Sequence, residues 1–307
     1  MVAVAVAEKR VIGVDLGGTK ILAGKIERDG TIVASSERPT PVASQEELLR
    51  ALDEVVEDVL GTAQGVVAVG LGIPSRIDHP SGRAVGSVNI PLADLDLRTR
   101  MEERFGLIVG LENDANAAAL AEWTLGAGRG TRDMVMLTLG TGVGGGVVVD
   151  GRLYRGWAEF GHIVVLHDGP PCQGSCTGHG HLETLASGTA AQKAAVATFG
   201  PEATAEELVR RATEGEEVAV RLLAEIGGYL GSGIASLVNI FNPQLVVLGG
   251  GFAAAGDLVF DAAREVVARE ALQPAGELVR LVPARLGSKA GVIGAGLIGF
   301  EVAEHGA

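Results

Sequence analysis

Three glycine-rich turns in the sequence, each placed directly after an apolar segment, have the residue types needed to hold phosphate groups. The backbone N–H groups of such turns can donate to phosphate oxygens. In the first turn Thr19 adds a hydroxyl, Lys20 a positive charge and Asp15 a carboxylate suited to lie beside Mg²⁺. One such turn alone is equally typical of a β-hairpin, but three together favour phosphate binding. The turns are Asp15-Leu16-Gly17-Gly18-Thr19-Lys20, Gly140-Thr141-Gly142 and Gly249-Gly250-Gly251.

None of these turns has the spacing of the two common nucleotide-binding loops. The Walker A pattern G-x-x-x-x-G-K-[ST] is absent from them, and neither 13–18 nor 142–146 keeps the dinucleotide-fingerprint spacing. The sequence therefore disfavours both a P-loop enzyme and a Rossmann enzyme.

Asp114 is a carboxylate well placed to accept a proton. It follows the apolar segment 107–112, which we predict to be a strand, and it opens an alanine-rich segment that we predict to be a helix to about Leu125. A hydroxyl group with a pKa far above 7 needs a base as its oxygen attacks phosphorus. The alternative role of Asp114 is a helix N-cap, for which Asp is well suited. Asp15 is the other candidate base, but its neighbours fit the phosphate side better.

Both cysteines of the chain belong to a segment with metal-ligand spacing. His162, Cys172, Cys176 and His181 follow the pattern H-x9-C-x3-C-x4-H, which suffices for one closed tetrahedral site with two sulfur and two nitrogen ligands. A closed ligand set predicts structural Zn²⁺. His179 is an alternative fourth ligand. A disulfide or two free thiols are the alternatives to a metal, and a reducing compartment disfavours the disulfide.

An α/β framework must position these residues, and the pattern of apolar residues predicts one. Apolar runs broken by glycine-rich turns indicate strands, and Ser44 with Glu47 forms a capping box ahead of residues at helical spacing. We expect strands at 11–16, 21–26, 31–36, 66–71, 107–112 and 245–248, and helices at about 44–60, 114–125, 220–241 and 288–302.

One part of this framework occurs twice in the sequence. The segment Val135–Val149 repeats the layout of Ile12–Ile26, with Thr138 in the place of Asp15. Chance similarity between two glycine-rich hairpins is the alternative explanation. A true repeat predicts two related units, which agrees with a chain of 307 residues, since a domain typically has about 150.

Composition and charge exclude several classes of protein. With 47% hydrophobic and 21% charged residues the chain is typical of globular proteins, not of disordered ones. A net charge of -13 disfavours binding to nucleic acid or to anionic membranes. We expect no apolar segment long enough to span a bilayer, and Met1–Arg10 lacks the features of a signal peptide. The sequence therefore predicts a cytoplasmic protein with no nucleic-acid or membrane partner.

The order of motifs along the chain resembles the ROK family of actin-like sugar kinases and sugar-sensing repressors. The resemblance implies two ribonuclease-H-like (actin-like ATPase) domains that flank an active-site cleft, with ATP in the cleft and closure over the sugar. We assign residues 1–115 plus about 290–307 to a small domain and 116–289 to a large domain that includes the zinc-binding segment 162–181. The motifs are DLGGTK at 15, GIP at 72, SVNIP at 87, ENDANAAALAE at 112, LGTGVGGG at 139, EFGH at 159 and the cysteine segment through Gly188.

The resemblance also implies roles for single residues. Asp114 becomes the general base that activates the 6-hydroxyl of a hexose, with glucose the first expectation and ATP the phosphoryl donor. Mg²⁺ binds between the phosphates and Asp15 through water. The implied sugar-binding residues are Asn89, Asn113, Asp114, Glu159, His162 and Glu183.

Alternatives remain at this stage. Another hexose (N-acetylmannosamine, N-acetylglucosamine, fructose or allose) could be the acceptor, and polyphosphate the donor. A repressor is disfavoured because the first predicted strand starts at Val11, which leaves no room for a DNA-binding helix-turn-helix. An actin-like filament protein would give no reason for the sugar-binding residues. Related kinases are homodimers or homotetramers, and we expect one of these states.

The cysteine segment departs from the family pattern, which has three cysteines after the histidine and one residue between the first two. Here three residues separate Cys172 from Cys176, and His181 stands where the last cysteine is expected. That match in register favours His181 over His179 as the fourth ligand. Imidazole also binds zinc, so the resemblance still implies a structural metal site.

Overall fold

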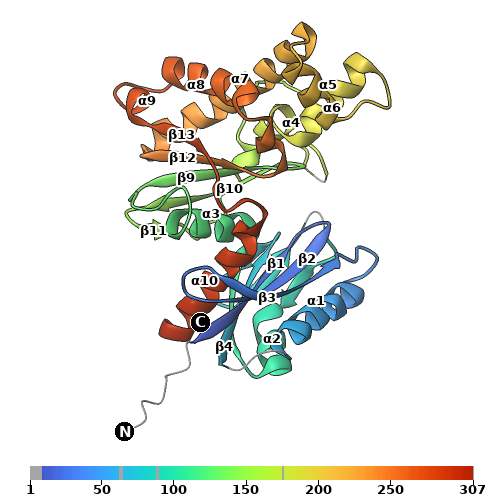
Figure 1. Cartoon of the computed structure of the whole chain (residues 1–307), viewed down its shortest axis with the longest axis vertical. Helices are drawn as coiled ribbons and strands as arrows, with labels where there is room; N and C mark the ends of the chain where they lie inside the picture. Colours follow the sequence, from blue (N-terminus) through green and yellow to red (C-terminus); the bar gives the residue numbers. More distant parts are fainter. Residues whose placement is uncertain (1–8, 62–64, 88–89, 175, 307) are drawn as a thin grey trace. The chain divides into compact units, whose positions relative to one another are not determined.

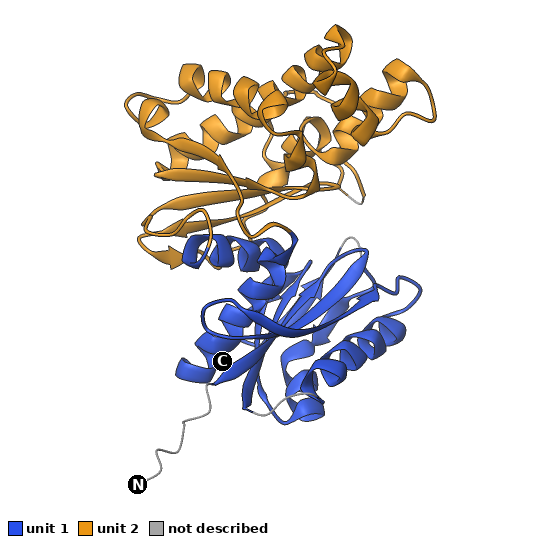
Figure 2. Cartoon of the chain, in the orientation of Figure 1, with its two compact units in different colours: residues 1–125, 288–307 blue, residues 126–287 orange. Residues whose placement is uncertain are grey.

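The computed structural model describes residues 9–61, 65–87, 90–174 and 176–306. It divides into two compact units, unit 1 with residues 1–125 and 288–307 and unit 2 with residues 126–287 (Figure 2). The helix α3 (Asp114–Thr124) therefore belongs to unit 1. The assignment of two functional domains with a boundary near residue 115 stays a prediction.

The core of unit 1 is a mixed five-stranded sheet with β1 (Arg10–Leu16) at its centre. Its strand order is β3-β2-β1-β4-β8, in which the first three strands are antiparallel and β1, β4 and β8 are parallel (Figure 1). Parallel strands end at one edge of a sheet, so residues at the carboxyl ends of β1, β4 and β8 lie near one another. The other strands are β2 (Lys20–Ile26), β3 (Ile32–Pro39), β4 (Val66–Ile73) and β8 (Ile108–Asn113).

Helices cover both faces of this sheet. On one face α1 (Gln45–Leu60) and α2 (Leu97–Phe105) bury apolar side chains against Ile12, Val14 and Leu16. On the other face lie α3 and α10 (Ala290–His305). The capping box predicted for α1 is confirmed in part, because the Ser44 hydroxyl accepts from the Glu47 N–H at 3.2 Å. A small antiparallel sheet formed by β5 (Arg76–Asp78), β6 (Arg83–Gly86) and β7 (Ala93–Asp96) precedes α2.

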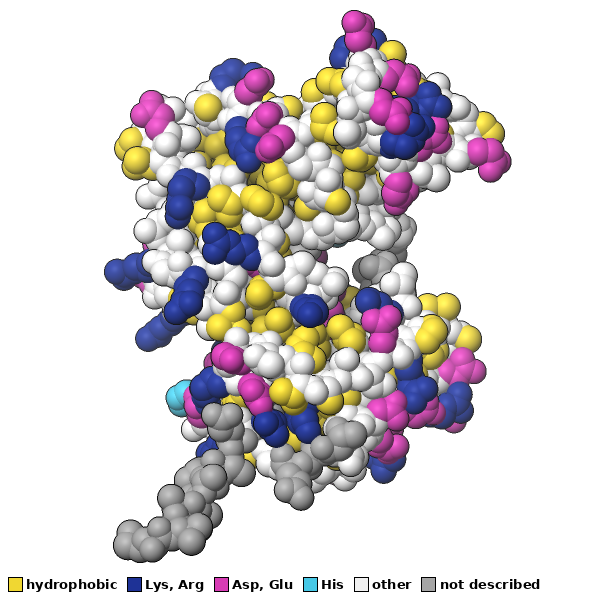
Figure 3. Space-filling model, viewed as in Figure 1, with side chains coloured by type: hydrophobic (Ala, Val, Ile, Leu, Met, Phe, Trp, Pro, Cys, Tyr) yellow, Lys and Arg dark blue, Asp and Glu magenta, His cyan; other side chains and the backbone are white. Residues whose placement is uncertain are grey.

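Ion pairs join α1 to its neighbours on the surface of unit 1. Arg100 of α2 binds both carboxylate oxygens of Asp53, at 2.8 and 2.6 Å, and Arg38 of β3 lies 2.9 Å from Asp58. Side chains of both signs therefore lie together on the side that carries α1 (Figures 1 and 3). Such pairs orient neighbouring elements, although each contributes little stability in water.

Unit 2 repeats the topology of unit 1. Its sheet has the order β11-β10-β9-β12-β13, with antiparallel pairing on one side of β9 and parallel pairing on the other. The strand registers of the two sheets also correspond. Asp15 of β1 pairs with Gly72 of β4, and Thr138 of β9, which takes the place of Asp15 in the repeat, pairs with Gly249 of β12. The predicted duplication is confirmed. The strands are β9 (Met134–Leu139), β10 (Val143–Val149), β11 (Arg152–Leu153), β12 (Leu245–Gly249) and β13 (Arg280–Pro283).

The long helix α7 (Glu217–Phe241) packs along α8 (Asp257–Glu270) in unit 2. Gly227 and Gly231 make this packing close, since a methyl group at Gly227 would lie 2.3 Å from the Val259 carbonyl oxygen. By length and composition α7 could span a membrane, so the expectation that no segment is long and apolar enough is wrong for this helix. Half of the most apolar 18-residue stretch of this helix is buried inside unit 2, as in core helices of globular proteins.

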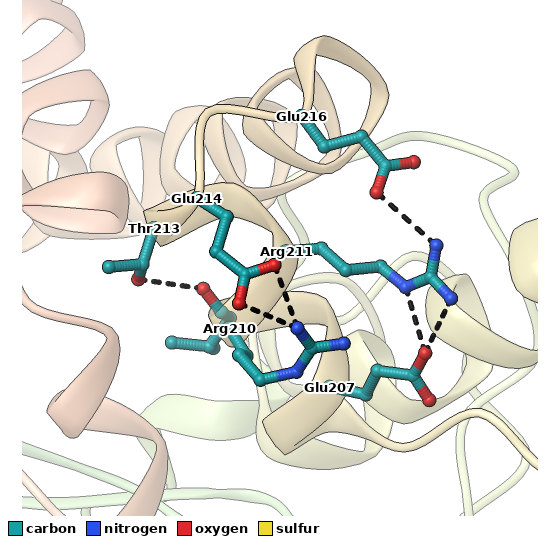
Figure 4. Close-up of polar contacts among 7 residues, drawn as sticks. Glu207, Arg210, Arg211, Thr213, Glu214 and Glu216 are labelled. Carbon is teal, nitrogen blue, oxygen red and sulfur yellow. Dashed lines mark hydrogen bonds and ion pairs between the residues drawn. The ribbon is translucent and has the colours of Figure 1, made fainter.

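Charged side chains also link the helices at the edge of unit 2 (Figure 4). Arg211 of α6 (Ala205–Thr213) donates to Glu207 at 2.8 and 2.6 Å and to Glu216 at 3.2 Å. Its guanidinium carbon lies 4.4 Å from the centre of the Phe199 ring, at the end of α5 (Gly188–Phe199). Arg211 thus connects α5, α6 and the start of α7, and Arg210 pairs separately with Glu214.

Candidate functional site

The carboxyl ends of the parallel strands in unit 1 bring Asp15 and Asp114 together. Asp15 pairs with Gly72, and Gly72 pairs in turn with Glu112, two residues before Asp114. A methyl group at Gly72 would lie 3.5 Å from the Cα atom of Asp114. The strand order therefore places two carboxylates at one edge of the sheet, at the kind of position where α/β proteins bind ligands.

The pKa of Asp15 is raised from 3.8 to about 6, first by burial and then by repulsion from Asp114, while the charge of Lys20 lowers it. A neighbouring cation would lower this pKa again, because it stabilises the charged form of the carboxyl group. The oxygen atoms of this group are also the ligand type that Mg²⁺ prefers. Asp15 therefore fits a place beside Mg²⁺ or its bound water.

The N-cap of α3 is Asn113 and not Asp114. The Asn113 side-chain oxygen accepts from the N–H groups of Ala115 and Asn116, at 3.0 and 3.2 Å. Asp114 is the first residue inside the helix, and its carboxylate accepts from the Ala115 N–H at 2.8 Å. The interpretation of Asp114 as the capping residue is therefore wrong. Its carboxylate, half-buried at the end of β8, is positioned by the first turn of α3.

Glu112 is a functional candidate that sequence reasoning missed. Its side chain is fully buried, accepts from the Asn113 N–H at 2.9 Å and from the Asn116 side-chain amide at 3.0 Å, and lies 3.6 Å from His79 Nε2. Glu112 thus fixes the turn from β8 into α3 that carries Asn113 and Asp114. The available signal was a carboxylate at the end of a predicted buried strand, where an apolar residue is usual.

The first glycine turn is a tight hairpin between β1 and β2. The Gly17 N–H donates to the Lys20 carbonyl at 2.9 Å, and Thr40 donates its hydroxyl to the Gly17 carbonyl at 2.7 Å. Gly18, Thr19 and Lys20 are exposed, and the Lys20 ammonium lies 2.7 Å from Glu37. The Gly17 N–H is therefore engaged within the hairpin, so the exposed part of the turn must supply any donors to phosphate.

The other two glycine turns lie together in unit 2. The Gly140 N–H donates to the Gly142 carbonyl at 3.0 Å, and the Gly188 N–H at the start of α5 donates to the Gly140 carbonyl at 2.8 Å. Gly250 adopts φ of 87°, and a methyl group there would lie 2.4 Å from the Leu139 carbonyl oxygen. Both turns thus meet at the carboxyl end of β9. Thr141 and Gly251 are exposed there, and Gly249 is buried in β12.

The structure describes two further residues expected to bind sugar hydroxyls, Glu159 and Glu183. Glu159 is exposed and precedes the short 3₁₀ helix Phe160–His162. Glu183, in α4 (Leu182–Leu185), lies over the second glycine turn, because a methyl group at Gly142 would be 2.4 Å from Glu183 Oε2. The position of Asn89 lies outside the described residues.

The four predicted metal ligands converge in unit 2, with donor atoms that all lie within 4.8 Å of one another. The Nδ1 atoms of His162 and His181 are 3.2 Å apart, and Cys172 Sγ to His162 and Cys176 Sγ to His181 are each 3.7 Å. Zinc bonds of about 2.0 Å to nitrogen and about 2.3 Å to sulfur place neighbouring tetrahedral donors about 3.3 to 3.8 Å apart. The cluster therefore has the size of a metal site, and His179 is not part of it.

Glu183 connects this cluster to the glycine turn. Cys172 donates to Glu183 Oε1 at 3.3 Å, while Glu183 Oε2 faces Gly142. Burial and this hydrogen bond raise the pKa of the Cys172 thiol to about 12. A thiol of this kind loses its proton when a metal ion replaces it, so metal binding would release Glu183 from the thiol.

The chain has an actin-like ATPase fold. Three features define it: two copies of a mixed sheet, glycine turns at the carboxyl ends of β1, β9 and β12, and carboxylates at the end of the parallel strands. The predicted fold class is confirmed. The sequence profile of the ROK family matches residues 11–300, and the chain belongs to that family.

Relatives with known functions and solved structures are similar over almost the whole chain. A glucokinase from Streptomyces coelicolor is 36% identical over 92% of this chain and 95% of the relative. A ROK family glucokinase from Streptomyces griseus, solved in complex with glucose and AMPPNP, is 35% identical with a TM-score of 0.82, over 95% of this chain and 99% of the other. A ROK hexokinase from Thermus thermophilus is 39% identical with a TM-score of 0.82, over 97% and 100%.

Proposed function

We propose that this chain is a glucokinase, which transfers the γ-phosphoryl group of ATP to the 6-hydroxyl of glucose. The observation that supports it most directly is the pair of carboxylates Asp15 and Asp114 at the end of the parallel strands in unit 1. The similarity of nearly the whole chain to two glucokinases makes a hexose the acceptor and ATP the donor.

The two carboxylates have different roles in this proposal. Asp114 accepts the proton of the attacking hydroxyl, since the first turn of α3 holds its carboxylate at the helix end. Asp15 would hold Mg²⁺ through a bound water, and the ion would supply positive charge to the phosphates. The raised pKa of Asp15 favours this division, because a neighbouring cation restores its charged form.

The proposed sugar-binding groups are Asn89, Asn113, Glu159, His162 and Glu183. Carboxylates accept two hydroxyl hydrogen bonds each, and the second ring nitrogen of His162 is available to a hydroxyl when Nδ1 faces the metal cluster. The exposed parts of the three glycine turns contribute donors to the phosphates, with Thr19 and Thr141 adding hydroxyls.

The ligand cluster of His162, Cys172, Cys176 and His181 would hold structural Zn²⁺. The donor separations fit a tetrahedral ion, and all four positions are taken by protein ligands. The metal would fix the orientation of His162 without taking part in the transfer. We also propose a cytoplasmic enzyme that is a homodimer or homotetramer.

A coupled assay that crosses a panel of hexoses with ATP and polyphosphate tests the function. We expect the highest kcat/KM for glucose with ATP. A higher value for N-acetylmannosamine, N-acetylglucosamine, fructose or allose would reassign the acceptor, and turnover with polyphosphate alone would reassign the donor. The absence of turnover on every hexose, in protein that binds ATP, would refute a sugar kinase.

A further inference from the structure

Helix α10 lies directly on the backbone of the sheet in unit 1. Gly13 of β1 and Gly70 of β4 pair in register. A methyl group at Gly13 would lie 2.2 Å from the Val292 carbonyl oxygen, and one at Gly70 would lie 1.8 Å from the Ala295 carbonyl oxygen. These distances leave no room for side chains, so the two glycines allow the helix and the strands to approach this closely.

This contact brings the first turn of α10 over Asp15. Side chains alternate along a strand, so Asp15 faces the same side of the sheet as Gly13. The helix begins at Ala290, and its second residue, Gly291, faces the carboxyl group of Asp15. A methyl group at Gly291 would lie 2.3 Å from Asp15 Oδ2 and 2.9 Å from Oδ1. The carboxylate therefore occupies the volume that any other side chain at 291 would need.

We propose that Gly291 is a positioning residue for Asp15: by lacking a side chain it allows the carboxylate to lie against the first turn of α10, in the orientation used toward Mg²⁺ and phosphate. This inference rests on the proposed function. The three heavy atoms nearest to a methyl group at Gly291 all belong to the Asp15 carboxyl group. Replacing Gly291 by Ala would therefore turn a side chain and leave the backbone in place.

Other glycines of the same helix have a different environment. A methyl group at Gly294 would lie 1.8 Å from the Ala117 carbonyl oxygen of α3, which is backbone and cannot turn away. Gly294 is therefore required for packing, whereas Gly291 leaves space for a functional side chain. This difference makes Gly291→Ala a variant that separates the position of Asp15 from the stability of the fold.

The test compares Gly291→Ala with Gly228→Ala, a control in α7 where a methyl group would meet no heavy atom within 4 Å. Calorimetry measures binding of AMPPNP with and without Mg²⁺, and a coupled assay measures turnover. For Gly291→Ala we expect a thermal midpoint and a glucose affinity like those of the wild type. Mg²⁺-dependent binding of AMPPNP should weaken about tenfold. The kcat should fall about 100-fold, which is the size of effect that a displacement of about 1 Å of the Asp15 carboxyl group produces. The control should match the wild type in turnover and in AMPPNP binding, and its thermal midpoint should be no lower than that of the wild type, because Ala favours a helix interior more than Gly does.

A double-mutant cycle shows whether the effect acts through Asp15. In Asp15→Ala the group that the new methyl would meet is gone, so adding Gly291→Ala should cost no further turnover or AMPPNP affinity. Wild-type kinetics and AMPPNP binding in Gly291→Ala would overturn the inference, as would additive losses in the double variant. If the wild type turned over no hexose, the proposed function would fail, and the calorimetric comparison would still decide the role of Gly291.

Discussion

Replacing Asp15 by Asn should stabilise unit 1 at pH 7 while it removes most of the activity. The pKa of this carboxyl group is raised from 3.8 to about 6 by burial and by repulsion from Asp114. Above pH 6 the folded protein therefore holds a charge where charge is unfavourable, at a cost of about 3 kcal/mol. An amide of the same shape carries no charge, so we expect Asp15→Asn to raise the free energy of unfolding by about 1 to 3 kcal/mol at pH 7.

The effect should depend on pH with a definite sign. Between pH 3.8 and about 6 the folded protein keeps a proton on Asp15 that the unfolded chain has lost. The free energy of unfolding of the wild type therefore falls as pH rises through this window, and the cost is complete above it. The advantage of Asp15→Asn should be near zero at about pH 4 and largest at pH 7 and above.

Urea unfolding at several pH values measures this difference. The chain has two tryptophans, Trp123 in α3 of unit 1 and the exposed Trp157 in unit 2, so a Trp157→Phe background makes the fluorescence report on unit 1. This choice matters because the two units need not unfold together. Asp94→Asn is the matched control, since a hydrogen bond from Arg83 holds the pKa of Asp94 below its usual value.

The control should change in the opposite direction. Asp94→Asn should lose stability at pH 7, and the loss should disappear as pH falls. If Asp15→Asn were no more stable than the wild type at any pH between 4 and 8, the reasoning from desolvation would be refuted.

Three further predictions concern the base, the metal cluster and the packing of α10. Asp114→Asn should lower kcat by a factor of about 10² to 10⁴, measured in the coupled assay, and leave the calorimetric glucose affinity nearly unchanged; near-normal turnover would exclude Asp114 as the base. Cys172→Ser should reduce the metal content from about one zinc per chain and lower the thermal midpoint, whereas wild-type protein purified without zinc and indifferent to chelation would argue against the site. Gly70→Ala should destabilise unit 1 by about 3 kcal/mol in urea unfolding, because its methyl group would meet the Ala295 carbonyl oxygen; a loss below about 0.5 kcal/mol would contradict the close packing.

Much of the fold could be predicted from the sequence because apolar runs and glycine turns are local signals. The strand pair around the first turn and the long helix α7 fall within a few residues of the expected ranges. The repeat was readable because 135–149 keeps the spacing of 12–26. No helix was predicted from the sequence at α5, α6 or α8, although the capping residue Thr204 directly precedes α6.

The candidate site was harder to predict, because it depends on contacts between distant segments. Motifs indicated Asp114 and the metal ligands, but only the folded chain shows that Asn113 is the capping residue and that Glu112 holds the turn. The engagement of Lys20 with Glu37 and of the Gly17 N–H within the hairpin likewise follows from strand pairing. No pattern in the sequence connects Gly291 with Asp15, which lie 276 positions apart.

The matching registers of the two sheets give each unit the same position at the end of its central strand. In β1 that position holds Asp15, and in β9 it holds Thr138. A duplicated backbone can thus keep its geometry while one copy carries an acid and the other a neutral hydroxyl. This asymmetry matters for phosphate binding, because an acid at the position of Thr138 would repel any phosphate bound by the glycine turns of unit 2, whereas a hydroxyl can donate to it. The duplicated units therefore keep the same backbone geometry, while a difference at one residue gives only one of them a negative charge at this position.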